Sequence, residues 1–260
     1  MKATLAQAVG SMTDFGGGRA TGAGVLMQRA PAPPRTRAGP VAVRSLGRWT
    51  AVFVGLSTAV TVVGAAVSWR LVALLDGSGD APPAAADRWD DVFSYQAPLD
   101  LALRAAAVAM VAIWLHRVRV NAESFGVDAF RRAARWAVAG WIVPVVNLWF
   151  PKQVMDDVWM ASDPGRPAEA TDVRRVRGPL VVLTWWVCWM VSVVGSLVWL
   201  NRPWVMDAEQ ALTAYRAAAW SGPFVAAAGV LLVLIVLRVS RWQGERVRTL
   251  DRLRRQDLAA

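Results

Sequence analysis

The sequence predicts an all-α polytopic membrane protein, with four transmembrane helices plus a kinked re-entrant or interfacial helical segment. Three observations predict this class. Of the 260 residues, 55% are apolar, and they gather in long blocks instead of the short periodic patterns of a soluble domain. Four blocks reach the roughly 20 residues that span the hydrocarbon core of a bilayer. Arginines flank these blocks and dominate the formal net charge of +10.

The predicted crossings are residues 49–71, 99–120, 179–200 and 219–239. Each contains no acid in its middle. Small residues four positions apart, such as Gly222 and Ala226, allow neighbouring helices to approach closely in lipid. The helical membrane domain is therefore predicted at 48–240, and a basic cytoplasmic C-terminal helix or tail follows at 241–260.

Residues 1–47 are predicted to form a disordered cytoplasmic tail rich in Gly, Ala, Pro and Arg. The run GGGRATGAG at 16–24 and the run APAPPRTRAGP at 30–40 offer few large apolar side chains for a core. No Gly-Lys-Ser/Thr follows the glycines, so they are not a phosphate loop. Met12 and Met27 leave two other start positions open.

A fifth apolar stretch lies within GWIVPVVNLWFPKQVMDDVW, residues 140–159. Pro144 removes a backbone donor and disfavours a straight helix. Asn147 is predicted to satisfy the freed backbone groups in a turn, and Pro151 suits the first turn of a new helix. The segment 136–161 is therefore predicted to enter the cytoplasmic leaflet, turn, and return along the surface.

The returning part of this segment has the pattern of an amphipathic interfacial helix. Its apolar stripe consists of Val154, Met155, Val158 and Trp159. Asp156 and Asp157 are predicted to lie on the opposite, solvated face with Lys152 and Gln153. Neighbouring residues on a helix point about 100° apart, so the two acids are a poor catalytic carboxylate pair.

The distribution of basic residues predicts whether the fifth stretch crosses the membrane. Leaving out Arg104, which lies inside a predicted crossing, 24 basic residues lie inside and 4 outside if the stretch does not cross. If it crosses, 14 lie on each side. Because basic residues accumulate on the cytoplasmic side, we expect a multi-pass protein of the cell membrane with both termini cytoplasmic.

The same region carries a motif series that resembles a known family. The series is Arg117-x-Arg119-x-Asn121-Ala122, Trp136-x4-Trp141-x2-Pro144-x2-Asn147-Leu148-Trp149-x-Pro151, Met155-x3-Trp159 and Ala161-Ser162-Asp163-Pro164. It is similar to a bacterial, mostly actinobacterial, membrane family catalogued as domain of unknown function 4328, over roughly residues 44–239. The resemblance implies the membrane architecture and no assigned activity. The candidate interaction residues are Trp136, Trp141, Pro144, Asn147, Trp149, Pro151 and Trp159.

Two further groups of residues have both a structural and a functional interpretation. Many of the 15 tryptophans lie at block ends, where interfacial anchoring is the favoured role; these are Trp49, Trp69, Trp114, Trp199, Trp220 and Trp242. An aromatic ligand site around Trp185, Trp186 and Trp189 is the less favoured alternative.

Arg104 is the one charge well inside a block, and we expect it to pair with Asp100 one turn earlier in a structural role.

The sequence predicts no catalytic, cofactor-binding or metal-binding residues. Cys188 and His116 are single residues of their types, too few for a metal cluster, and no nucleophile stands beside a base. We therefore expect a protein that is not an enzyme. The basic charge is that of cytoplasmic loops, so no nucleic-acid partner is expected.

A scaffold or regulatory membrane subunit is the favoured function. Its expected partners are the lipid bilayer, anionic lipids at the Arg-rich tails, and another membrane protein or a second copy of the chain. The alternative is a small transporter or channel in which residues 136–159 line the path.

Sided thiol labelling tests the predicted topology. We expect a chain with Cys188→Ser and Gly165→Cys to react with a membrane-impermeant maleimide only after the cells are opened. The charge count requires this loop to lie inside, next to the other basic segments. Labelling of intact cells would mean that the fifth stretch crosses the membrane.

Overall fold

The computed structural model describes residues 42–77, 83–125, 127, 129–166, 172–175, 177–200 and 208–259. Its four long helices are α1 (Arg44–Gly77), α2 (Pro83–Ala122), α6 (Leu180–Leu200) and α7 (Ala208–Asp257). Within this part of the chain, each is long and apolar enough to span a bilayer. The prediction of an all-α membrane protein with four transmembrane helices is confirmed. The one β pairing among these residues is an isolated parallel bridge between Ala129 and Asp172.

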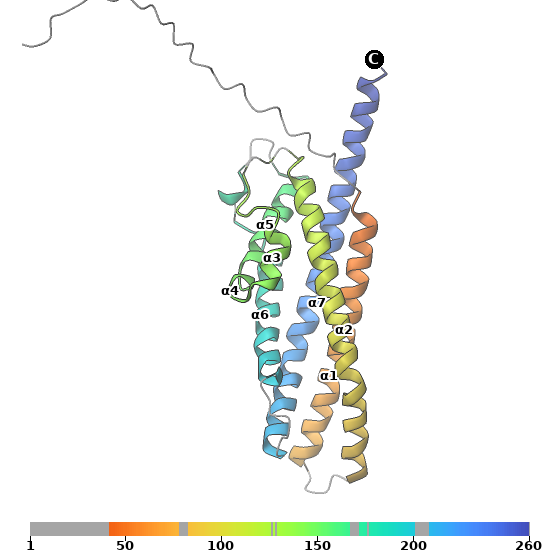
Figure 1. Cartoon of the computed structure of the whole chain (residues 1–260), viewed down its shortest axis with the longest axis vertical. Helices are drawn as coiled ribbons and strands as arrows, with labels where there is room; N and C mark the ends of the chain where they lie inside the picture. Colours follow the sequence, from red (N-terminus) through yellow and green to blue (C-terminus); the bar gives the residue numbers. More distant parts are fainter. Residues whose placement is uncertain are drawn as a thin grey trace, which may run out of the picture. The chain divides into compact units, whose positions relative to one another are not determined.

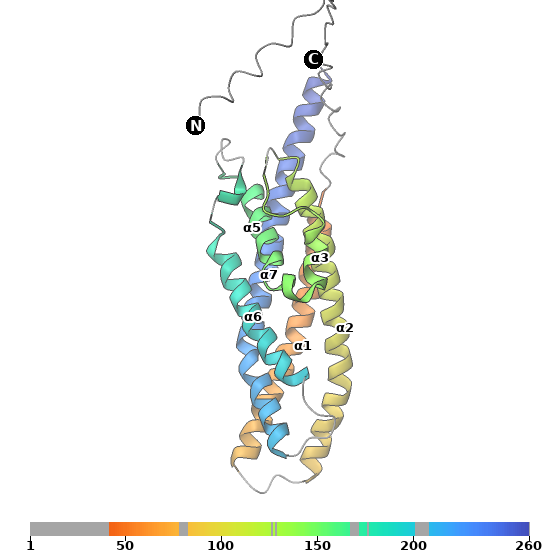
Figure 2. The same cartoon turned by 60° about the vertical axis from the view of Figure 1, so that its left-hand side comes forward.

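The long helices form a bundle around α7 (Figures 1 and 2). Helix α7 packs along both α1 and α6, and α2 packs on α1. In the described part of the chain, α2 and α6 do not pack on each other. The three short helices α3, α4 and α5 lie between them, beside one half of the bundle (Figure 2).

The short helices follow the breaks that the prolines predict. Helix α3 (Trp136–Ile142) ends before Val143, whose backbone is extended with φ −83° and ψ 113°, as expected for a residue before proline. Helix α4 (Pro144–Asn147) begins at Pro144, and α5 (Phe150–Ser162) has Pro151 in its first turn. A 3-10 turn, η1 (Val173–Arg175), precedes α6.

This segment enters and leaves the bundle at the same end, which we call the Arg-rich end. Gly47 near the start of α1 lies against Ser240 of α7, and Trp114 near the end of α2 donates its indole N–H to the Ser240 hydroxyl at 2.9 Å. Helix α5 packs on α2, α6 and α7 there. At the opposite end lie the end of α1, the start of α2, the end of α6 and the start of α7 (Figure 1).

The segment reaches deep between the long helices. The ring of Trp141 at the end of α3 packs edge-on against Trp189 of α6, with 5.8 Å between ring centroids. Trp189 lies nine residues beyond Leu180, the first residue of α6. At 1.5 Å per residue, Trp189 is about 13 Å along the helix axis from the start of α6, and Trp141, which packs on it, lies at a similar depth. This depth is close to the middle of a hydrocarbon core of about 30 Å.

Several predicted boundaries differ from the structure. Most of the predicted tail, residues 1–41, lies outside the described residues. Its last part belongs to the bundle, because Val43 is 2% exposed and α1 already begins at Arg44. Helices α2 and α7 also start well before the predicted crossings and continue through Pro98 and Pro223. These prolines lie within otherwise regular helices, a placement that is tolerated in membrane helices.

Two of the tryptophans predicted as interfacial anchors are instead core residues. Trp114 is fully buried and Trp242 is 8% exposed. Trp49 and Trp220 are more than half exposed, as the anchoring role requires. Trp242 packs on Trp159 of α5, and Trp114 lies beside Gly47 of α1 and Ser240 of α7. The pattern of a single helix does not predict these contacts.

Close packing of α1 on α7 generates a stability prediction. A Cβ at Gly222 would lie 2.7 Å from the Cβ of Ala65, an atom that cannot move without shifting α1. We expect Gly222→Ala to lower the stability by about 1–3 kcal/mol, the usual cost of overpacking. The matched control is Gly55→Ala on α1, where no heavy atom lies within 4 Å. Thermal unfolding in detergent measures both, and equal midpoints would contradict the prediction.

Candidate functional site

The first candidate residues hold the broken segment together. Trp136 begins α3 and packs edge-on against Phe150 of α5, with 4.7 Å between ring centroids. Gly140 allows this close approach, because a Cβ there would lie 3.3 Å from the Cβ of Phe150. Pro151 is buried, whereas Trp149 is 43% exposed. The motif therefore folds α3 against α5 as a helical hairpin.

Asn147 does not have its predicted role in capping the turn. Helix α4 has no side-chain cap hydrogen bond, and the Oδ1 atom of Asn147 is buried without a hydrogen-bond partner among the described residues. The turn is closed by backbone, with the Asn147 N–H donating to the Val143 carbonyl at 2.8 Å. A helical turn of the backbone satisfies these groups without the side chain.

Trp159 joins the end of the motif to α7. Its ring packs edge-on against Trp242, with 4.9 Å between centroids. The guanidinium of Arg238 lies over both rings, 5.6 Å from the first and 5.0 Å from the second. This contact places α5 on the part of α7 that leaves the bundle.

The acidic pair is buried, so its predicted solvated position is wrong. Asp156 is 4% exposed and Asp157 is fully buried. Asp157 accepts hydrogen bonds from the backbone N–H of Arg131 at 2.7 Å and from the Arg131 guanidinium. Asp156 pairs with Lys152 at 2.6 Å. Burial raises the pKa of both carboxyls above the usual range for Asp, although the neighbouring cations lower it in part.

The physical reason is that the connection between α2 and α3 covers the polar face of α5. Besides Arg131, Arg132 of this connection donates from Nε to Gln153 Oε1 at 2.7 Å, and its guanidinium lies 3.8 Å from the Phe150 ring centroid. On this face the two aspartates are buried, while Lys152 and Gln153 are half-buried. The pattern of α5 alone carries no signal for this covering.

A buried glutamine links three helices at the same end. Gln243 of α7 is fully buried and donates from Nε2 to the Val118 carbonyl of α2 and to the Ser162 hydroxyl of α5, both at 2.9 Å. Its Oε1 accepts from Asn121 Nδ2 at 3.2 Å. Sequence reasoning missed this residue because it lies in the segment assigned to the C-terminal tail.

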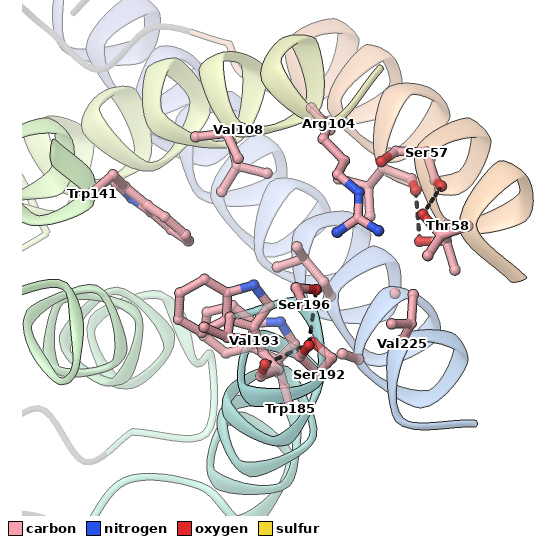
Figure 3. A pocket seen from close by; sticks show the side chains of 18 residues that line it. Ser57, Thr58, Arg104, Val108, Trp141, Trp185, Ser192, Val193, Ser196 and Val225 are labelled. Carbon is pink, nitrogen blue, oxygen red and sulfur yellow. Dashed lines mark hydrogen bonds between the residues drawn. The ribbon is translucent and has the colours of Figure 1, made fainter. Parts of the chain in front are cut away.

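The other half of the bundle contains a cavity of about 300 Å³ between α1, α2, α6 and α7, with Trp141 at its inner end (Figure 3). Trp185 and Trp189 of the predicted aromatic cluster line it, together with Ser192 and Ser196. The indole N–H groups of Trp141 and Trp185 are buried and have no hydrogen-bond partner among the described residues. The cavity thus combines an aromatic wall with unused donors.

Arg104 of α2 is a charged residue in the wall of this cavity. The predicted pair with Asp100 is present, since Arg104 Nε donates to Asp100 Oδ2 at 2.6 Å. The hydroxyl of Thr61 donates to the other oxygen of Asp100 at 2.6 Å. A second cavity of about 120 Å³ shares Thr61, Arg104 and Ser196 with the first and continues toward Gln96.

The described residues of this site offer groups that can bind a ligand. Within the described part of the chain, no group of three or more His, Cys, Asp or Glu side chains could hold a metal ion. Cys188 of α6 is a half-buried free thiol. The arrangement offers one guanidinium, two indole donors and hydroxyl groups in apolar surroundings.

Comparisons with known proteins identify one family. The family model described as Domain of unknown function (DUF4328) matches residues 78–241. The matched segment holds α2 to α6 and most of α7, including all the motif residues, and leaves out α1, which the expected range of 44–239 included. No curated protein and no solved structure matches the chain.

The buried ion pair of Asp157 generates a second stability prediction. We expect Asp157→Ala to lower the free energy of unfolding by about 3–5 kcal/mol, because Arg131 then lacks its buried counter-charge. The control is Asp251→Ala, at an exposed position on α7. Unfolding in detergent with increasing denaturant compares the two variants. A loss no larger than that of the control would show that the pair does not hold the connection on α5.

Proposed function

The chain belongs to the DUF4328 family, and we propose that it is a non-enzymatic membrane subunit that holds a partner protein in the cytoplasm through the extension of α7. In this proposal the protein lies in the cell membrane with both termini in the cytoplasm. Support for the orientation comes from the geometry of the Arg-rich end. The segment between α2 and α6 returns to that end, which supports the arrangement with most basic residues inside.

The length of α7 carries the proposal. The helix has 50 residues, which is about 75 Å at 1.5 Å per residue, against about 30 Å for the hydrocarbon core. Its C-terminal part rises beyond the other helices (Figure 1). Residues 251–259 are exposed. A single helix without tertiary contacts is marginally stable in water, so a surface that covers this extension would stabilise it.

The charge and direction of the extension favour a protein partner over lipid. Arg252, Arg254 and Arg255 are exposed, and Leu253 between them is 51% exposed. The extension continues the axis of a membrane helix, so it points away from the bilayer and only its base lies near lipid head groups. An acidic protein surface with an apolar contact for Leu253 is the complementary partner.

The base of the extension is held rigidly. The buried Gln243 fixes α7 to α2 and α5, and Arg246 donates to the Ala161 carbonyl at 2.8 Å. Fixing the direction of a helix before binding lowers the entropy cost of association. This rigidity suits a subunit that presents a binding element.

The small transporter or channel is the second candidate, and the joined cavities favour it. They end at Trp141 of the re-entrant segment, which would have to move to open a path. Against this candidate, Trp114, Met155 and Gln243 are fully buried and belong to the tightly packed Arg-rich half. Protein-dependent flux of a small solute into reconstituted vesicles, changed by Trp141→Ala, would favour transport.

Site-specific photocrosslinking tests the proposed partner. With a benzophenone amino acid in place of Leu253, we expect a discrete adduct with another protein in intact cells. The adduct should disappear when Arg252, Arg254 and Arg255 are all replaced by Glu, because charge reversal repels an acidic surface. The matched control is the same probe at Leu56, which is 51% exposed in a membrane-spanning part of α1. Adducts with lipid alone, or only with a second copy of the chain, would contradict the proposal.

A further inference from the structure

We propose that the cavity in the bundle binds a single-chain amphiphile with a carboxylate head group, held by Arg104 with its hydrocarbon chain along the tryptophan wall. This inference is independent of the partner proposed for α7. It rests on the charge, the donors, the shape and the accessibility of the cavity.

The wall of the larger cavity contains a cationic side chain, Arg104, which also pairs with Asp100. Arg104 is the one charged side chain among the described residues that line the larger cavity. Its carboxylate partner Asp100 lines only the smaller cavity, and both oxygens of that carboxylate already accept hydrogen bonds. Asp100 takes up Arg104 Nε, while the two terminal nitrogens point into the larger cavity (Figure 3). Two parallel N–H groups are the geometry that binds a carboxylate.

The position of Arg104 makes an anion favourable. It lies eight residues inside the spanning part of α2, which begins at Gln96, so it is about 12 Å from that end at 1.5 Å per residue. A charge at this depth is costly unless it is paired or hydrated. Asp100 offsets part of this cost, and a bound carboxylate would complete the coordination of the guanidinium.

The remaining wall fits a hydrocarbon chain with one further polar contact. Val108, Val193 and Val225 line the cavity, and Trp185 and Trp189 add flat aromatic surfaces. The Trp185 side chain is 1% exposed and its indole N–H is a buried donor without a partner among the described residues. Free donors of the cavity therefore include the terminal Arg104 nitrogens and the indole nitrogens, whereas the hydroxyls of Thr58, Ser192 and Ser196 already donate to backbone carbonyls. In the proposed complex, an oxygen-bearing anion binds at these nitrogens.

The size and the opening of the cavity favour a ligand with a single hydrocarbon chain. A volume of about 300 Å³ is at the lower end for ligand pockets, too small for a phospholipid with two acyl chains. Val108 lines the cavity and is also 46% exposed. The cavity therefore reaches the molecular surface beside α2, where the surrounding medium is lipid and a single-chain amphiphile is soluble.

Photolabelling of the purified full chain in nanodiscs tests the proposal. The probe is palmitate with a diazirine in its chain. We expect saturable labelling of α2 and α6, with competition by unlabelled palmitate and at least about tenfold weaker competition by hexadecanol, which lacks the charge that Arg104 recognises. Labelling that does not saturate, or equal competition by both compounds, would overturn the assignment.

Two variants separate binding from folding. Val108→Phe fills the cavity from its open side, and we expect it to abolish saturable labelling. Its control, Ile113→Phe, changes a 52% exposed residue of the same helix outside the cavity and should leave labelling unchanged. The double variant Asp100→Asn with Arg104→Gln removes both charges while keeping hydrogen-bonding side chains, and should weaken binding about tenfold or more. Wild-type labelling of Val108→Phe would overturn the proposal even if the double variant did not fold.

Discussion

The architecture depends on one constraint, that a helix broken inside a bilayer must keep its backbone hydrogen bonds within the protein. At Val143, between α3 and α4, the backbone is extended, yet the Val143 N–H donates to the Ala139 carbonyl at 3.2 Å and its carbonyl accepts from the Asn147 N–H at 2.8 Å. Among the described residues, helices α2 and α6 do not pack on each other, and α3 packs against α2 and α5 in the space between them. The short helices fill the Arg-rich half of the space so created, and the cavity with Trp141 at its inner end occupies the other half. The cavity is thus a geometric result of accommodating the re-entrant segment.

Polar contacts determine the arrangement of the helices, which apolar packing in lipid alone does not. Lipid tails are as apolar as the helices, so side-chain burial distinguishes weakly between one packing arrangement and another. Gln243 specifies the position of α7 against α2 and α5, because two of its hydrogen bonds reach α2 and one reaches α5. Asp157 does the same for the connection between α2 and α3 through Arg131. Both lie at the Arg-rich end. In the opposite half, Thr61 of α1 donates to Asp100 of α2 and Trp69 of α1 donates to the Ala219 carbonyl of α7, beside close contacts such as that of Gly222 with Ala65.

Local patterns predicted the fold better than the site. About 20 apolar residues suffice to identify a crossing, and Pro144 and Pro151 mark the breaks because proline acts on its immediate neighbours. The pair of Asp100 and Arg104 was predictable since four residues make one helical turn. Asp157 is buried against Arg131, and Trp114 is buried against α1 and α7. The pattern of one helix contains neither contact. The cavity forms only where four helices and Trp141 come together. The sequence therefore indicated only its aromatic residues.

Helix α7 connects the cavity with the C-terminal extension, the two features on which the proposals rest. Gly229 and Leu232 line the cavity, and the same uninterrupted helix ends at Asp257. From Gly229 to Asp257 the helix is about 42 Å long at 1.5 Å per residue. Between these two points, Gln243 and Arg246 fix it to α2 and α5. The cavity wall and the exposed tip are therefore parts of one clamped rod, so the direction in which the tip points is set by the same packing that shapes the cavity.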